Sequence, residues 1–313
     1  MNKQLLNRRE FGEICVALGP SLSTVGALLA APSGALALDL AGVRRTVKFR
    51  DGTVVPALGQ GSAGLGHGKR PEAAEEEALR TGFTLGMTLI DTAELYSSEE
   101  LIGRVIAGQR SRVFLVSKVW KTHVAGDGIA QACEASLARL GTDHLDLYLL
   151  HSPDGVTNLP EVVTAFERLR SAGKISAWGV SNFKVSDMEN LFRIPRGDRC
   201  ATNQVPYSIA DRLIERDLLP WCKRHGMPVM AYSPLGGAGS SLLRDPAVAR
   251  IAAAHGCSPA AVALAWTIRS GSVIAIPESG SVEHVKENAV AFSLTLTSRD
   301  LRAVDAAHPP ANR

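Results

Sequence analysis

The sequence has no paired cysteines, no run of like charges and no basic stripe interleaved with aromatic residues. Zinc sites and redox motifs rely on closely spaced cysteines such as C-x-x-C, so neither is expected. The net charge is only +3 over 313 residues, which argues against nucleic acid as a partner. Four single cysteines beyond residue 37 are each expected to be a buried small hydrophobic residue: Cys133, Cys200, Cys222 and Cys257.

A long unbroken apolar run is also missing, because glycine and proline interrupt the apolar stretch 14–38. A membrane helix of about 20 apolar residues is therefore disfavoured. Arg8-Arg9 precede the stretch, and the small-x-small pattern Gly34-Ala35-Leu36-Ala37 ends it. This combination is typical of a signal peptide for the twin-arginine export machinery. We expect a signal over residues 1–37 and a periplasmic mature protein, with a membrane anchor or a disordered tail as alternatives; an inefficient signal would leave the protein cytoplasmic.

The mature region, residues 38–313, reads as one α/β domain. It opens with a predicted β-hairpin, Thr46–Phe49 and Thr53–Val55 around Asp51-Gly52. Short apolar runs then alternate with helices whose apolar residues recur every three or four positions, as at Ile129, Cys133, Leu137 and Leu140. Such alternation predicts a single (β/α)8 TIM barrel. The expected strands are 57–58 (weak), 88–90, 113–117, 145–150, 175–180, 201–205, 228–232 and 273–276.

Polar residues lie at the ends of most of these strands: Asp91, Lys118, His151, Ser181-Asn182 and Tyr232-Ser233. Asn203-Gln204 fall inside the strand 201–205. The carboxyl ends of the strands form the active site in this type of barrel. These side chains are therefore expected to meet at one mouth.

Gly59-Gln60-Gly61-Ser62-Ala63-Gly64 spells G-x-G-x-x-G, the fingerprint of a Rossmann dinucleotide site. That fingerprint requires a helix to open immediately, whereas further glycines prolong this segment to Pro71. We interpret it as a flexible loop beside the barrel mouth.

The segment Asp91-Thr92-Ala93-Glu94-Leu95-Tyr96, followed by Glu99 and Gly103, resembles the signature D-T-A-x-x-Y-x-x-E-x-x-x-G of the aldo-keto reductases. The resemblance extends from about Lys48 to Ala307. It implies an NAD(P)H-dependent reductase of small aldehydes, ketoaldehydes or sugars, similar to bacterial methylglyoxal or aldehyde reductases. The further matching motifs are 117–118, 149–151, 178–183, 203–205, 231–236, 276–279 and 287–288.

The resemblance assigns the four catalytic positions to Asp91, Tyr96, Lys118 and His151. Tyr96 would donate a proton to the carbonyl oxygen, and Lys118, held by Asp91, would lower the pKa of the phenol. His151 would hydrogen-bond the substrate oxygen and orient it.

The resemblance also implies a cofactor site, with NADP(H) favoured and NAD(H) possible. Tyr232 would stack on the nicotinamide, Ser233 and Leu235 would hold the pyrophosphate, and Ser181, Asn182 and Gln204 would bind the carboxamide. The 2′-phosphate position departs from the family pattern, because Glu278 and His284 replace a lysine and an arginine. The remaining candidates near it are Ser279, Ser281, Lys286, Glu287 and Asn288.

Trp120 either lines the substrate pocket or is a packed surface aromatic. A non-catalytic NADP-binding regulatory subunit is the alternative function, but the intact set Asp91, Tyr96, Lys118 and His151 argues against it. A barrel hydrolase lacks support, since no paired-carboxylate, metal or nucleophile-elbow motif occurs in the sequence.

Overall fold

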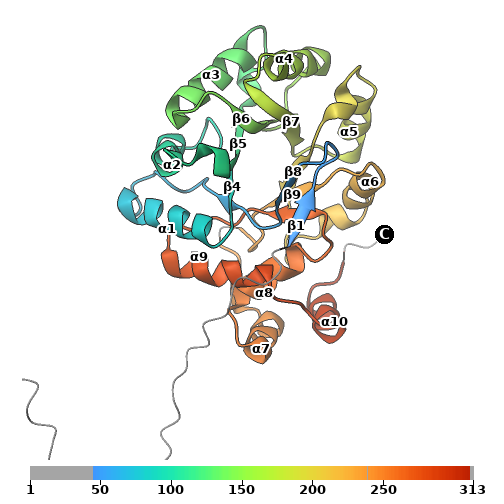
Figure 1. Cartoon of the computed structure of the whole chain (residues 1–313). Coiled ribbons are helices and arrows are strands. Elements are labelled where there is room, and N and C mark those ends of the chain that lie inside the picture. The colour runs from blue at the N-terminus through green and yellow to red at the C-terminus, as the bar shows by residue number, and fades with distance from the viewer. Residues whose placement is uncertain (1–44, 238, 311–313) are drawn as a thin grey trace, which may run out of the picture. The chain divides into compact units, whose positions relative to one another are not determined.

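The computed structural model describes residues 45–237 and 239–310. The predicted signal peptide, residues 1–37, lies outside the described residues. Helices surround a central sheet of parallel strands (Figure 1), which confirms the predicted (β/α)8 architecture. In sheet order the strands are β3 (Gln60–Gly61), β4 (Leu89–Asp91), β5 (Phe114–Val119), β6 (Leu145–Leu150), β7 (Ile175–Ser181), β8 (Asn203–Pro206), β9 (Val229–Tyr232) and β10 (Val273–Ala275).

The seam that closes the barrel differs from the sequence prediction. The first strand is Gln60–Gly61, three residues later than expected, and Leu58 makes only an isolated bridge to Ala275. A second bridge joins Gly61 to Glu278. A Cβ on Gly61 would lie 2.7 Å from the carbonyl oxygen of Ile276, so glycine allows the two strands to approach. The first half of the G-x-G-x-x-G segment is therefore a strand, and only its second half is a loop.

The helices cover the outside of the sheet, and several of them begin at a residue whose side chain caps the first turn. The side chain of Asp245 accepts the backbone N–H groups of Ala247 and Val248 at the start of α7, and Ser258 caps α8 in the same way. The helices are α1 (Glu72–Thr84), α2 (Glu99–Ile106), α3 (Gly128–Leu140), α4 (Leu159–Ser171), α5 (Val185–Phe192), α6 (Leu218–Arg224), α7 (Pro246–His255), α8 (Pro259–Thr267), α9 (Val282–Ala289) and α10 (Ser298–Ala307). Because α1 begins only at Glu72, the Rossmann interpretation stays rejected.

The predicted hairpin is formed by β1 (Thr46–Lys48) and β2 (Val54–Pro56). Its buried residue Phe49 stacks on Phe114, with ring centroids 5.8 Å apart. Phe114 begins strand β5, so the hairpin packs at the amino-terminal end of the barrel. The hairpin therefore leaves the opposite end of the barrel, where the parallel strands have their carboxyl ends, free for the candidate site.

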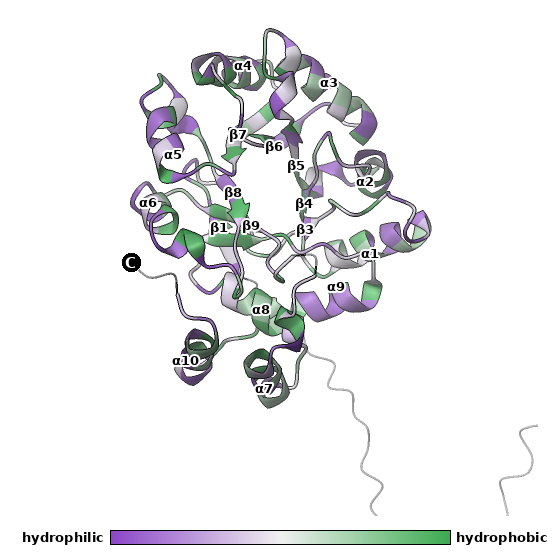
Figure 2. Ribbon diagram, turned by 180° about the vertical axis from the view of Figure 1, so that it is seen from behind, coloured by the Kyte–Doolittle hydropathy of each residue, from purple (hydrophilic) through white to green (hydrophobic). Residues whose placement is uncertain are grey.

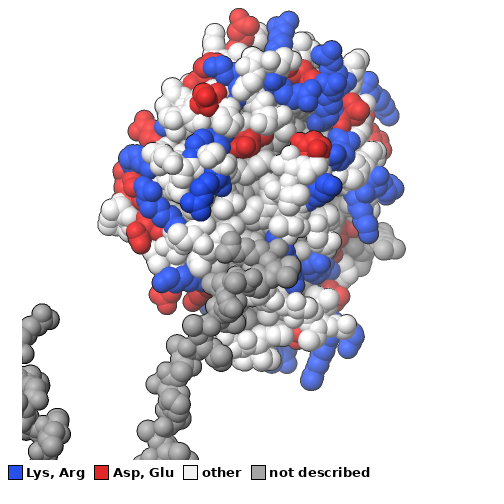
Figure 3. Space-filling model, viewed as in Figure 1, with Lys and Arg blue, Asp and Glu red and all other residues white. Residues whose placement is uncertain are grey.

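Helix α8 is buried from Ala260 through Thr267, and Figure 2 shows it as largely hydrophobic. Within residues 45–237 and 239–310, no single helix is long and apolar enough to cross a membrane; α7 and α8 meet the requirement only as a pair bent by 97°. Cys133, Cys200 and Cys222 are buried as expected, while Cys257 is half-buried. On the face seen in Figure 3, acidic and basic side chains are intermixed.

Candidate active site

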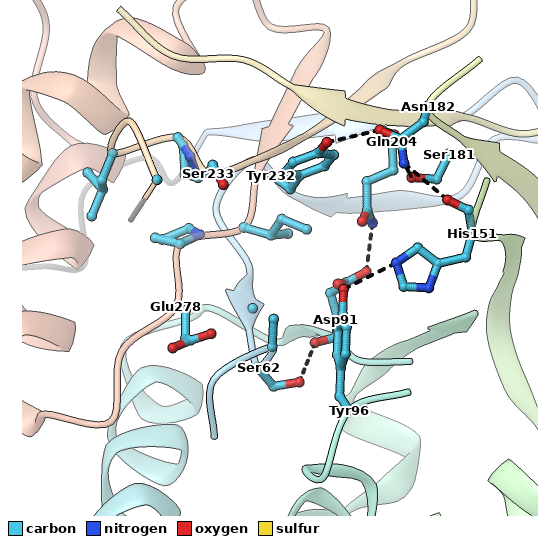
Figure 4. A pocket seen from close by; sticks show the side chains of 17 residues that line it. Ser62, Asp91, Tyr96, His151, Ser181, Asn182, Gln204, Tyr232, Ser233 and Glu278 are labelled. Carbon is cyan, nitrogen blue, oxygen red and sulfur yellow. Dashed lines mark hydrogen bonds between the residues drawn. The ribbon is translucent and has the colours of Figure 1, made fainter. Parts of the chain in front are cut away.

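The carboxyl ends of the strands surround a cavity of about 590 Å³. Figure 4 shows polar side chains from different strands directed into this space. The polar strand ends therefore converge as the sequence predicted. The predicted residues that line the cavity are Asp91, Tyr96, His151, Ser181, Asn182, Gln204, Tyr232, Ser233, Leu235 and Glu278.

Asp91 and Lys118 form a buried ion pair at the base of the cavity. The Lys118 ammonium donates to Asp91 Oδ1 at 2.6 Å and to the carbonyl oxygen of Thr92 at 2.8 Å, and its side chain is fully buried. The second oxygen of Asp91 accepts a hydrogen bond of 2.7 Å from the side chain of Gln204. Each charge thus has a partner, which a buried ion requires. Lys118 lies behind Asp91 and does not line the cavity itself.

Tyr96 and His151 place two polar atoms next to each other on the cavity wall. The Tyr96 hydroxyl lies 3.5 Å from His151 Nε2, and the two rings meet edge to face with centroids 5.7 Å apart. The Lys118 ammonium lies 4.9 Å from the centre of the Tyr96 ring. A carbonyl oxygen placed between the hydroxyl and Nε2 would therefore have two neighbouring hydrogen-bond donors, provided that Nε2 carries the imidazole proton.

The side chains of Asn182 and Tyr232 form the opposite wall. The Tyr232 hydroxyl donates to Asn182 Oδ1 at 2.9 Å, and Asn182 Nδ2 donates to the carbonyl oxygen of His151 at 3.0 Å. Asn182 has a left-handed backbone (φ 65°), a conformation that asparagine tolerates better than most residues. These contacts fix the face of the Tyr232 ring that borders the cavity.

Glu278 forms part of the rim. Its carboxylate accepts the backbone N–H of Gly64, from the loop that follows β3. A Cβ on Gly64 would lie 2.5 Å from Glu278 Oε1, so the carboxylate fills the space that a side chain at residue 64 would need. Glu278 thereby joins the two loops on either side of the barrel seam.

The other residues predicted near the 2′-phosphate do not line the cavity. Ser281 caps α9 by accepting the backbone N–H of His284 at 3.5 Å, and the Ser279 hydroxyl donates to the carbonyl oxygen of Ser281. His284 is exposed and Asn288 is buried. Glu287, like them, lies on α9.

Trp120 also lies outside the cavity lining, but it contacts a residue within it. Its half-buried ring meets the His151 ring edge to face at 5.2 Å between centroids. Its backbone N–H donates to the carboxylate of Glu94, which also contacts His123 Nδ1 at 3.0 Å. Trp120 is therefore a packed aromatic residue that supports His151, which agrees with the second of the two interpretations drawn from the sequence.

The sequence pattern that describes the Aldo/keto reductase family matches residues 57–309. The chain belongs to the aldo/keto reductase family. Methylglyoxal reductase YeaE of Escherichia coli K12 is 46% identical over 272 residues, which cover 85% of this chain and 95% of that protein. Glyoxal reductase of Bacillus subtilis is 34% identical over 267 residues, 84% of this chain and 93% of the relative.

Solved structures lead to the same family. An aldo/keto reductase from Klebsiella pneumoniae, crystallised with NADP and acetate, is 45% identical and superposes with a TM-score of 0.83. The match covers 87% of this chain and 98% of that one. A crystal structure of aldo-keto reductase from the same organism with NADPH has the same identity and TM-score.

The pKa of Tyr96 in this aldo/keto reductase differs from the sequence expectation. Burial and the carboxylates of Asp91 and Glu278 raise the pKa of the phenol, whereas Lys118 was expected to lower it. The expectation omitted burial, which is the largest cause, and the carboxylate of Asp91, which offsets the charge of the ammonium that it holds. Burial likewise raises the pKa of Asp91 and lowers that of Lys118, against their mutual attraction. Burial and the charge of Lys118 lower the pKa of His151 to about 4.

These pKa shifts predict the pH dependence of the aldo/keto reductase. The kcat/KM for carbonyl reduction should change little between about pH 6 and pH 9, because His151 stays neutral above its pKa of about 4 and Tyr96 stays protonated below its raised pKa. Oxidation of the alcohol product needs the Tyr96 phenolate, so its kcat/KM should rise with pH. Both profiles can be measured by cofactor absorbance, and a reduction profile that titrates near pH 7 would contradict the assignment.

Several lining residues were not predicted: Gly61, Ser62, Ala63, Pro234, Gly237, Ile276 and Pro277. Ser62 is buried and donates to the backbone carbonyl of Asp91 at 2.8 Å. It follows β3, the strand whose position the sequence left weak. A correct position for β3 would have placed Ser62 at a strand end, where the other lining residues were found.

Proposed function

We propose that this protein reduces small aldehydes and 2-oxoaldehydes to alcohols with NADPH as the reductant. The observation that carries the proposal is the convergence of Tyr96, His151 and the Asp91–Lys118 pair at one cavity. The substrate class follows from the methylglyoxal and glyoxal reductases among the relatives. NADPH is favoured because related proteins were crystallised with NADP and NADPH.

The residues present fit a nicotinamide dinucleotide. The Tyr232 ring offers an aromatic face to the cavity, and Ser181 and Asn182 lie next to it. Gln204 donates its N–H to Asp91, which leaves its carbonyl oxygen as an acceptor for the carboxamide. Ser233 and Leu235, on the loop after β9, would hold the pyrophosphate. When bound, the reduced nicotinamide supplies the hydride.

The side chains of the protein bind the carbonyl oxygen of the substrate and protonate it. His151 Nε2 and the Tyr96 hydroxyl hold the carbonyl oxygen between them, which fixes its orientation. The Tyr96 proton passes to that oxygen as negative charge develops on it. Asp91 and Lys118 do not touch the substrate and act by positioning Tyr96.

The direct test is turnover of the purified protein with methylglyoxal and NADPH, followed by loss of absorbance of the reduced cofactor. Product analysis should show the corresponding alcohol in equal amount. A protein that binds NADPH and yet reduces neither methylglyoxal nor a panel of simple aldehydes would favour the non-catalytic subunit instead.

Glu278 is expected to weaken NADPH binding, because its carboxylate would repel a 2′-phosphate at this rim. Glu278→Lys should raise NADPH affinity about tenfold, the lower end for a charged hydrogen bond, and leave NADH affinity nearly unchanged. Glu278→Gln is the control, since it removes the negative charge without adding a positive one. The dissociation constants of NADPH and NADH for the wild type and both variants can be measured by fluorescence quenching. Equal shifts for both cofactors would contradict the prediction.

We also propose that residues 1–37 direct export through the twin-arginine machinery and that residues 38–313 form the periplasmic enzyme. The support is the Arg8-Arg9 pair, the interrupted apolar stretch and the Ala35-Leu36-Ala37 ending. Because this route exports folded proteins, the cofactor would be bound before export. Changing Arg8 and Arg9 to lysine should retain the protein in the cytoplasm, as measured by cell fractionation. Unchanged fractionation would contradict the proposal.

A further inference from the structure

The described residues that line the cavity include no lysine or arginine. The proposed cofactor carries two phosphates in its pyrophosphate, and NADP carries a third on the adenosine ribose. Backbone N–H groups can hold a pyrophosphate, but a terminal phosphate is usually paired with arginine or lysine. Since the lining itself includes the carboxylates of Asp91 and Glu278, a cation from outside the lining is needed to favour NADP.

Arg70 supplies a positive charge beside the edge of the cavity that Glu278 forms. It precedes Pro71 near the end of the loop between β3 and α1, and its side chain lies over Gly280. A Cβ on Gly280 would be 3.0 Å from Nη1 of Arg70 and 3.3 Å from its Cδ. Gly280 follows the cavity-lining residue Glu278 by two positions, and α1 packs against α9. The guanidinium therefore lies close to the rim that Glu278 forms.

The guanidinium of Arg70 is available to a ligand. Arg70 is exposed, and the arginine–carboxylate pairs among the described residues involve other arginines. The two nearby carboxylates have backbone partners. Glu75 accepts the N–H of Gly66 at 2.8 Å, and Glu278 accepts the N–H of Gly64.

We propose that Arg70 binds the 2′-phosphate of NADP and is the residue that favours NADPH over NADH in this protein. A guanidinium can donate two parallel hydrogen bonds to one phosphate. Arg70 thus supplies, from a different segment of the chain, the charge that Glu278 and His284 do not provide. The inference rests on the proposed function, because it requires a dinucleotide in this cavity.

The test compares dissociation constants of NADPH and NADH for the wild type and for Arg70→Ala, Arg70→Lys and Lys286→Ala. Arg70→Ala should weaken NADPH about tenfold, because a charged hydrogen bond at an exposed rim gives the lower end of the usual effect, while NADH changes less than about twofold. Arg70→Lys should retain part of the NADPH affinity. Lys286, an exposed cation on α9, is the rival partner for the 2′-phosphate that the sequence offers. If Arg70 holds the phosphate, Lys286→Ala should change neither constant.

Two fragments of the cofactor, one with the 2′-phosphate and one without it, show which part of the ligand Arg70 contacts. Adenosine 2′,5′-bisphosphate should lose affinity for Arg70→Ala by the same factor as NADPH, and 5′-AMP should not. Unchanged NADPH affinity in Arg70→Ala, equal losses for both cofactors, or a loss confined to Lys286→Ala would overturn the role of Arg70. A wild-type protein that binds neither NADPH nor NADH would overturn the proposed function as well, so the two failures are distinguishable.

Discussion

Replacing Tyr96 with phenylalanine should lower the rate of carbonyl reduction by about 10² to 10⁴, the range found when a general acid is removed. The phenylalanine ring keeps the shape of the cavity and the edge-to-face contact with His151. It removes only the hydroxyl that lies 3.5 Å from His151 Nε2. The loss should therefore appear in kcat, with the dissociation constant of NADPH changed little.

Tyr148→Phe is the matched control for this substitution. Tyr148 is fully buried on β6, and its hydroxyl has no hydrogen-bond partner among the described residues. Removing an unpartnered buried hydroxyl should leave turnover unchanged and cost no stability. If Tyr96→Phe turned over at the wild-type rate, Tyr96 would not be the proton donor. A loss of equal size in both variants would point to a general effect of the substitution.

The strand ends could be predicted because buried parallel strands are continuous apolar runs followed by an abrupt polar residue. This rule placed Asp91, His151 and Ser181 at the mouth, where the structure has them. The position of the first strand, β3, could not be predicted in this way. Gln60–Gly61 contains no apolar residue, and its position depends on how closely Gly61 approaches Ile276 across the seam. Contacts of that kind are invisible in a local pattern.

The electrostatics of the site could not be predicted for a similar reason. The pKa of Tyr96 depends on its burial and on Glu278, which is remote in sequence. A pairwise argument from Lys118 to Tyr96 omitted the carboxylate that neutralises the ammonium. The position of Arg70 over Gly280 likewise results from the packing of α1 against α9. Sequence motifs thus identified residues that the fold brings to one cavity, whereas the charges around them could be found only from the fold.

Replacing Lys118 with methionine should destabilise the protein by about 3 to 5 kcal/mol, because it leaves the buried carboxylate of Asp91 without its cation. Methionine has a similar length, so the change is mainly one of charge. Gln204 would still donate to Asp91, but one neutral hydrogen bond does not replace an ammonium at 2.6 Å. The loss should appear as a lower urea midpoint and as slower carbonyl reduction, since the pair positions Tyr96.

The double variant Asp91→Asn, Lys118→Met separates stability from activity. It removes both charges and keeps an oxygen that accepts from Gln204, so most of the lost stability should return. Carbonyl reduction should remain at least about tenfold below wild type, because the groups that position the proton donor are still missing. Urea midpoints and kcat for the wild type, both single variants and the double variant complete the cycle. A double variant no more stable than Lys118→Met would mean that the single change acts through packing and that the unpaired charge of Asp91 is not the cause.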